Sequence, residues 1–184
     1  MMSSNLRLVR FMAGTVSAIV LTACAATIHV ESYAVRGADF NRYRTYGFAP
    51  ADQVSTGDPR LDNNPFFNER MQADIDKQLA ANGFEKTASP TPDLLIHYHA
   101  SFRWQVDVNG VDQEHGYCRS GDCLPFAYEA GTLTVDLVET GTSSLVWRGW
   151  AECGVDGVID NQTWLEQKVD DAVTRILAQL PRRR

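Results

Sequence analysis

The chain has 184 residues, of which 44% are apolar and 22% are charged, and these proportions fit one globular domain rather than a disordered chain. The formal net charge is -6, and basic residues gather only at 182–184. Because the rest of the chain has no basic stripe to attract phosphate groups, we expect no nucleic-acid partner and a solvated basic tail at 182–184.

Residues 1–23 have the features of a bacterial lipoprotein signal peptide. Arg7 and Arg10 precede the apolar run FMAGTVSAIVL, which is too short to span a bilayer. The next residues, Leu21-Thr22-Ala23-Cys24, resemble the lipobox, in which the cysteine receives a diacylglycerol before the signal peptide is cut off. We therefore predict that Cys24 is the lipidated N-terminus, carrying palmitate-type acyl chains, and that 24–27 form a short tether. The alternative is an uncleaved anchor helix with an incidental cysteine.

The residue after Cys24 is Ala25 rather than aspartate. By resemblance to the sorting rule of enteric bacteria, this favours the periplasmic face of the outer membrane. The tether ends at a strand-like segment, 28–35, so the domain is expected to lie within about 10 to 15 Å of the bilayer.

The first elements of the mature chain are two strands and a helix. Residues 28–35 alternate in polarity and 40–50 are rich in aromatic residues, which predicts two strands, whereas the polar stretch 51–63 predicts a loop. Asn64 is a good N-cap and Pro65 suits the first helical position. Asn82-Gly83 then predicts the helix end. The core face of this helix is predicted to comprise Phe67, Met71, Ile75 and Leu79.

The segment PDLLIHYHASFRWQVDV, residues 92–108, predicts a long strand because its residues alternate in polarity. One face carries Ile96, Tyr98, Ala100, Phe102 and Trp104. The other face carries His97, His99, Ser101, Arg103 and Gln105, a pattern typical of an antiparallel sheet with one solvated side.

A hairpin and a second helix follow. Residues 131–140 and 145–153 predict two strands joined by a turn, with Leu145, Trp147, Ala151 and Cys153 on the apolar side and Arg148, Trp150 and Glu152 on the other. A helix is expected from Asp160 or Asn161 to Pro181. The element order predicts one α+β domain at 28–181, a two-layer sandwich of a mostly antiparallel sheet with two amphipathic helices packed on one face.

Four segments in this order, ADFNRYRTYGFAP, PDLLIHYHASF, GTLTVDLVETGTSSLVWRGWAE and AVTRILAQLP, resemble bacterial lipoproteins of the domain-of-unknown-function family 4136. The resemblance covers nearly the whole mature chain and implies an envelope lipoprotein without established chemistry. The family carries a glycine- and aromatic-rich stretch where this chain has NGVDQEHGYCRSGDCLPFAY, so the role of the loop 105–127 is open.

Three histidines are candidate metal ligands. His97 and His99 project from one side of the predicted strand, and His115, or Glu114 or Asp112, would complete a zinc or copper site. His29 would join this metal site only if its strand, 28–35, pairs alongside the strand that carries His97 and His99. The competing interpretation is that these are ordinary surface histidines, so we expect neither a metal nor a cofactor to be required.

The chain lacks the G-x-S-x-G, H-E-x-x-H, Walker A and G-x-G-x-x-G motifs. We therefore expect no enzyme. Trp150 shares a face with Arg148 and, with Tyr117 from the loop, forms a candidate binding surface for a protein, peptidoglycan or lipid partner; a cross-strand aromatic that only stabilises the sheet is the alternative.

After Cys24, three cysteines remain in what we expect to be an oxidising compartment. Cys118 and Cys123 flank the turn-prone RSGD, which favours a disulfide between them, while Cys153 fits a buried apolar position. The alternative is that Cys153 pairs with one of the two. The sequence thus predicts a non-catalytic, membrane-anchored binding module, with a periplasmic metal-binding protein as the alternative.

Overall fold

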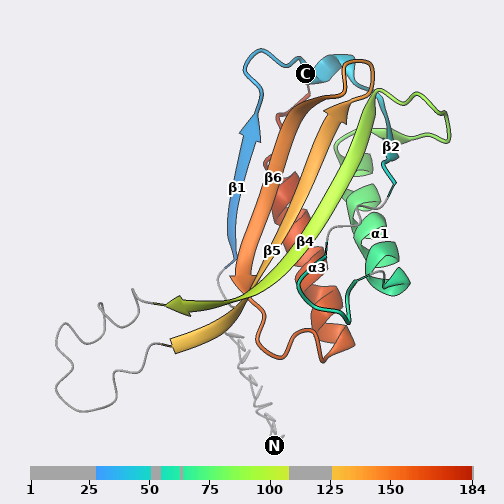
Figure 1. Ribbon diagram of the computed structural model, residues 1–184. Helices are drawn as coiled ribbons and strands as arrows, with labels where there is room; N and C mark the ends of the chain where they lie inside the picture. Colours follow the sequence, from blue (N-terminus) through green and yellow to red (C-terminus); the bar gives the residue numbers. More distant parts are fainter. Residues whose placement is uncertain (1–27, 51–54, 63, 108–125, 184) are drawn as a thin grey trace, which may run out of the picture.

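The computed structural model describes residues 28–50, 55–62, 64–107 and 126–183, which form a six-stranded sheet with two long helices on one face (Figure 1). The strands are β1 (His29–Ala34), β2 (Thr45–Phe48), β3 (Glu85–Lys86), β4 (Leu94–Asp107), β5 (Phe126–Glu139) and β6 (Ser144–Gly154). The helices are α1 (Pro65–Ala81) and α3 (Gln162–Leu177), with a 3-10 turn at Phe40–Arg42. The predicted two-layer α+β sandwich is confirmed.

The sheet is open, with the strand order β1-β6-β5-β4-β2-β3. The pairs β1/β6, β6/β5 and β5/β4 are antiparallel, whereas β2 runs parallel to both β4 and β3. The sequence predicted neither the parallel pairing of β2 nor the two-residue strand β3. Both follow from α1, which crosses one face of the sheet and returns the chain to the β2 edge.

Strand β5 in the central ladder begins five residues earlier than the strand predicted at 131–140. Strands β4 and β5 pair over 14 residues each, and Gln105 to Asp107 lie opposite Phe126 to Tyr128. The strand predicted at 92–108 already includes Gln105 to Asp107, and the structure confirms it. The loop bounds 105–127 overlap this strand, and their other end is wrong because residues 126 and 127 already belong to β5. Residues 108–125 lie outside the described part of the chain.

Both helices begin as predicted. The side chain of Asn64 accepts a hydrogen bond from the Phe67 N–H at 3.3 Å, and Asn161 caps α3 in the same way at the Trp164 N–H. At the end of α1, Gly83 has a φ of 79°, which glycine adopts without strain and which permits the hydrogen bond from Phe84 N–H to the Leu79 carbonyl. None of the helices in the described residues is long and apolar enough to cross a membrane.

The two helices lie side by side and run in the same direction. Arg70 of α1 lies 3.8 Å from the carboxylate of Glu166 on α3. Two turns further along α1, Lys77 donates to Asp170 of α3 at 2.9 Å. Gln78 donates to the hydroxyl of Thr174 at 2.7 Å. Figure 1 shows that both helices begin at the end of the sheet where β1 begins and β4 ends. We call this end of the domain the lower end, as it is drawn in Figure 1, and we call the opposite end the upper end.

The core lies between the helices and one face of the sheet. The predicted α1 residues are all buried, as is Trp147 at the centre of β6. The assignment of Leu145 to the face of Trp147 was wrong. A bulge inserts Val146 into β6, so that Trp147 pairs with Leu137 whereas Leu145 pairs with Val138, and Val146 is buried.

Candidate functional site

The face of the sheet opposite the helices carries the predicted binding residues Arg148 and Trp150. Arg148 is exposed and donates two hydrogen bonds of 2.6 Å to the carboxylate of Asp136 on β5, which raises the pKa of the guanidinium. The arginine is therefore held by a carboxylate rather than by the indole of Trp150, which is half-buried between Thr134 and Glu31. Tyr117 lies outside the described residues.

The histidines His97 and His99 lie half-buried on this same face, as the alternation predicted. Asp136, the carboxylate opposite His97, already accepts from Arg148. His29 is on β1, three strands from β4 and therefore about 14 Å away, which is too far to share a metal ion. Among the described residues no group of three His, Cys, Asp or Glu side chains could hold a metal ion, and His115 lies outside them.

The cysteines Cys24, Cys118 and Cys123 also lie outside the described residues. Cys153 is a free thiol, half-buried on the helix side of β6 as predicted. Burial raises the pKa of the Cys153 thiol, and this effect exceeds the opposing influence of the nearby Lys168 ammonium. The thiol is consequently protonated at neutral pH and is a poor nucleophile.

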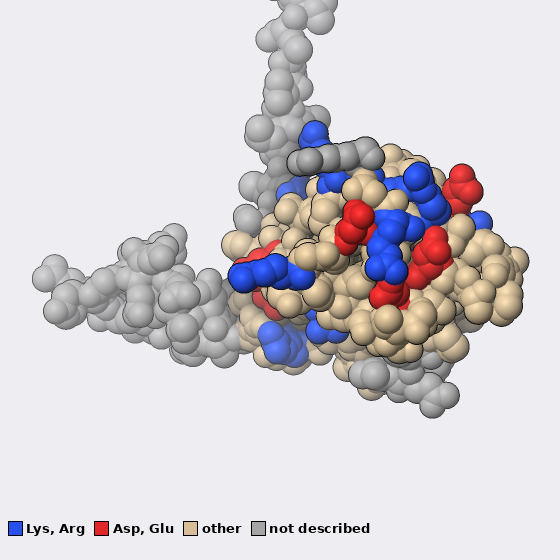
Figure 2. All heavy atoms as spheres, turned by 90° about the horizontal axis from the view of Figure 1, so that it is seen from above, with Lys and Arg blue, Asp and Glu red and all other residues tan. Residues whose placement is uncertain are grey.

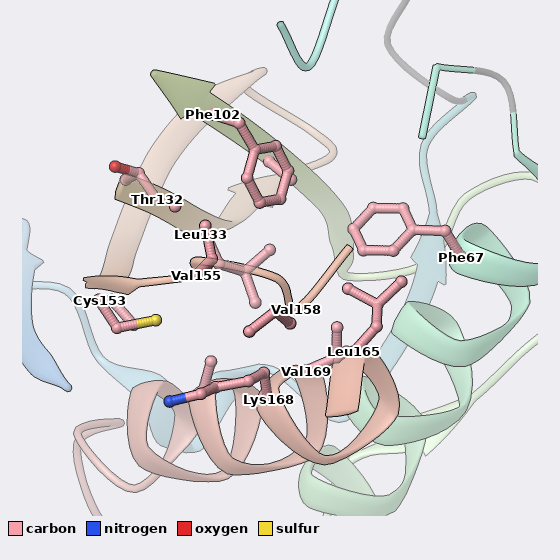
Figure 3. A pocket seen from close by; sticks show the side chains of 14 residues that line it. Phe67, Phe102, Thr132, Leu133, Cys153, Val155, Val158, Leu165, Lys168 and Val169 are labelled. Atoms are coloured by element: carbon pink, nitrogen blue, oxygen red, sulfur yellow. The ribbon is translucent and has the colours of Figure 1, made fainter. Parts of the chain in front are cut away.

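Cys153 and Lys168 border an apolar cavity between the sheet and α3, with a volume of about 50 Å³ (Figure 3). Its sheet side is lined by the small residues Ala100, Gly131 and Ala151, which stand on three adjacent strands. Of these three, Gly131 is covered by Val155 and Phe102, because a Cβ there would lie 2.9 Å from Val155 and 3.1 Å from Phe102, so its missing side chain does not itself leave the space beneath α3. The remaining lining residues are Phe67, Phe102, Thr132, Leu133, Val155, Val158, Leu165, Val169 and Ala172.

Lys168 is the one cationic side chain of this lining. Figure 3 shows its ammonium group and the sulfur of Cys153 on the same side of the cavity. Lys168 is half-buried and, within the described part of the chain, forms no hydrogen bond or ion pair. The cavity therefore combines apolar walls with a cationic side chain at its border that is in no direct ion pair, although the Asp171 carboxylate lies near enough to act on the same Cys153 thiol.

The sequence interpretation missed this cavity. The alternation pattern placed Ala100 and Ala151 on the core faces of their strands, but only the pairing register shows that they flank Leu133 in one row. Gly131 lies in the next row of the same face, between Phe102 and Cys153. A possible signal was the run of small residues at core positions of three strands, although each of them alone is ordinary in a strand.

A second, polar hollow of about 430 Å³ lies at the upper end and is bordered by Arg42, Asp93 and Glu139. Its charges are already paired: Arg42 contacts Glu139 at 3.0 Å. Asp93 accepts from the backbone N–H groups of Arg44 and Thr45 at 2.7 and 2.8 Å, which lowers the pKa of its carboxyl group. The polar groups of this hollow therefore have a structural role: Asp93, the residue just before β4, holds the start of β2.

The fold and the cavity define a class of protein: an open, mixed six-stranded sheet with two parallel helices on one face and an apolar cavity beneath one helix. The chain belongs to the DUF4136 family, a domain of unknown function, whose model matches residues 30–182. This confirms the family that the four sequence segments indicated. No curated protein matches the chain significantly.

Solved structures with low sequence identity are similar to the chain. The PelC dodecamer from Paraburkholderia phytofirmans has 14% identity and a TM-score of 0.51, over 86% of this chain and all of that one. A PDZ domain protein from Parabacteroides distasonis has 15% identity and a TM-score of 0.53, over 86% of this chain and 37% of that one. A DUF4136 family protein from Bacteroides thetaiotaomicron has 16% identity and a TM-score of 0.48, over 80% of this chain and 95% of that one. At these identities the likeness concerns the fold alone.

Proposed function

We propose that the chain is a non-catalytic binding module of the bacterial cell envelope, anchored through Cys24 to the periplasmic face of the outer membrane. We further propose that it holds the acyl end of an anionic amphiphile in the cavity beneath α3. The observation that carries the ligand class is the apolar cavity with the unpaired Lys168 at its border.

The cavity volume sets the size of the bound group. At about 50 Å³ it has room for about four water-sized groups, which suits the end of an acyl chain rather than a whole lipid. An empty apolar hole forfeits dispersion contacts that a bound hydrocarbon would restore. The ammonium of Lys168 would then lie where the chain leaves the cavity, and it would attract a carboxylate or phosphate headgroup.

A binding role without a chemical step agrees with the state of the nearby thiol. Cys153 is the nucleophilic side chain of the cavity wall, and burial raises its pKa instead of lowering it. Activated cysteines have the opposite environment, with a lowered pKa.

The ligand class is tested with three eight-carbon probes and the purified mature protein. Octanoate should bind more tightly than octanol or octyltrimethylammonium, as measured by titration calorimetry. Ala172→Leu places a larger side chain into the cavity wall and should reduce octanoate binding at least tenfold, whereas Ala178→Leu, on the exposed end of α3, should not. Lys168→Glu should remove the preference for the anionic probe. Equal octanoate binding by the parent and Ala172→Leu would exclude this cavity.

The anchor is tested separately in the bacterial host. Cells fed an alkyne analogue of palmitate should label the parent protein and not Cys24→Ala, and only the parent should sediment with the outer membrane. Labelling of Cys24→Ala equal to that of the parent would contradict the lipobox interpretation.

A further inference from the structure

We infer that the lower end of the domain rests on the bilayer and places Phe66, Trp104 and Trp164 in its interfacial layer. This inference rests on the lipid anchor of the proposed function, and it adds the surface with which the anchored domain faces the membrane.

Exposed large apolar side chains gather at the lower end. Among the described residues there are five such side chains, of which Tyr33 and Val35 stand on or just after β1. The other three are Trp104 at 72% exposure, Trp164 at 54% and Phe66 at 39%. Phe66 and Trp164 belong to the first turns of α1 and α3, and Trp104 to the last part of β4, so all three lie at the lower end.

The exposure of Trp104 follows from the lengths of the strands. Its alternation places it on the core face with Ile96 and Ala100, but its partner on β5 is Glu129. Strand β6 pairs with β5 only from Ala130 onward, so Trp104 lies beyond the part of the sheet that three strands share. A tryptophan extends past the core here, where a soluble surface would ordinarily carry a polar residue.

The anchored N-terminus reaches the domain at this same end. Ile28, the first described residue, is buried, and the next residue, His29, pairs with Glu152 near the end of β6. In the sequence Cys24 lies only four residues before Ile28. Four residues span at most about 14 Å even when fully extended, so an acylated Cys24 keeps the lower end close to the bilayer.

The charges of the two ends fit this orientation. Figure 2 views the upper end and shows Lys or Arg side chains mixed with Asp or Glu side chains, as expected for a surface in water. At the lower end Arg60 is paired with both Asp58 and Asp160, and Arg103 lies 3.9 Å from Glu152. Because these arginines are already paired, the contact depends on aromatic insertion rather than on attraction to anionic headgroups.

The interfacial residues are next to the cavity. Phe66 precedes Phe67, Trp164 precedes Leu165, and Trp104 is two positions from Phe102; the second residue of each pair lines the cavity. A domain seated on its lower end would therefore keep its acyl-binding cavity beside the lipid from which an acyl chain comes.

The test uses the chain's own tryptophans and the mature acylated protein in phosphatidylcholine vesicles. Half of the lipid carries dibrominated acyl chains, which quench tryptophan emission only on contact. Trp104→Phe with Trp164→Phe should lose at least half of the quenching. The matched control, Trp150→Phe on the open face of the sheet, should keep it, and adding anionic phosphatidylglycerol should change neither result.

Mass spectrometry of the Cys24 peptide separates the two proposals. An unacylated peptide overturns the anchor, and this inference falls with it. If Cys24 is acylated and the parent shows no quenching, or if the double variant is quenched as strongly as the parent, the membrane contact is overturned while the anchor stands.

Discussion

Replacing Gly149 with alanine should destabilise the protein strongly, although the change adds a single methyl group. A Cβ atom at Gly149 would lie 2.7 Å from Cγ2 of Ile176 and 2.8 Å from Cζ2 of Trp147, and closer still to the ring atom Cη2 of Trp147. Trp147 and Ile176 are both 0% exposed, so neither has free space into which it can move. Overpacking of this kind costs typically 1 to 3 kcal/mol, and with two rigid neighbours we expect about 3 kcal/mol.

Urea unfolding measures this cost. With a denaturant dependence of about 2 kcal/mol per molar, the midpoint should fall by about 1.5 M. Gly141→Ala is the matched control, because a Cβ there meets nothing within 4 Å, and it should be neutral or stabilising by up to about 1 kcal/mol.

A double-mutant cycle identifies the clash. In a Trp147→Phe background the smaller ring should reduce the cost of Gly149→Ala by at least about 1 kcal/mol. A Gly149→Ala protein as stable as the Gly141→Ala control would refute the packing explanation, and an unchanged cost in the Trp147→Phe background would remove Trp147 from it.

Three further outcomes are expected. Asp93→Asn should lower the free energy of unfolding most at neutral pH. The pKa of Asp93 is lowered from 3.8, so its carboxylate stabilises the fold above that value and loses this effect as the pH falls through the folded pKa. The difference in unfolding free energy between parent and variant should therefore shrink at acid pH. A thiol count on the denatured mature protein should give one, Cys153, whose alkylation should be slower in the folded state because burial raises its pKa; three thiols would refute the predicted loop disulfide. Zinc titration tests the histidine site: micromolar binding that is lost in His97→Ala with His99→Ala would support it, and no binding in the parent would remove it.

The sequence predicted well what local chemistry determines. The start and end of α1 follow from Asn64, Pro65 and Gly83, each of which acts on backbone groups within a few residues. The two faces of β4 follow from alternation, because the geometry of a strand imposes it. These predictions needed no knowledge of which strands pair.

The features that the sequence did not predict depend on which strands pair and on where each strand ends. The bulge at Val146 changes the face of Leu145, and a bulge leaves no clear mark in an apolar run. Alternation placed Trp104 on the core face correctly, but it contains no information on where the neighbouring strands and the helix layer end. The cavity is lined by residues of three adjacent strands, and only the folded chain defines how these strands pair.

The segments that carry the family resemblance explain the fold rather than a ligand. In PDLL, Asp93 binds the backbone at the start of β2, and in WRGWA, Gly149 leaves room for Trp147 under α3. Both roles are structural, so a protein could share these segments and bind something different. The binding specificity that we propose for this chain therefore depends on residues outside them, namely Lys168 and the exposed tryptophans of the lower end, where the fold itself requires neither a positive charge nor an exposed indole.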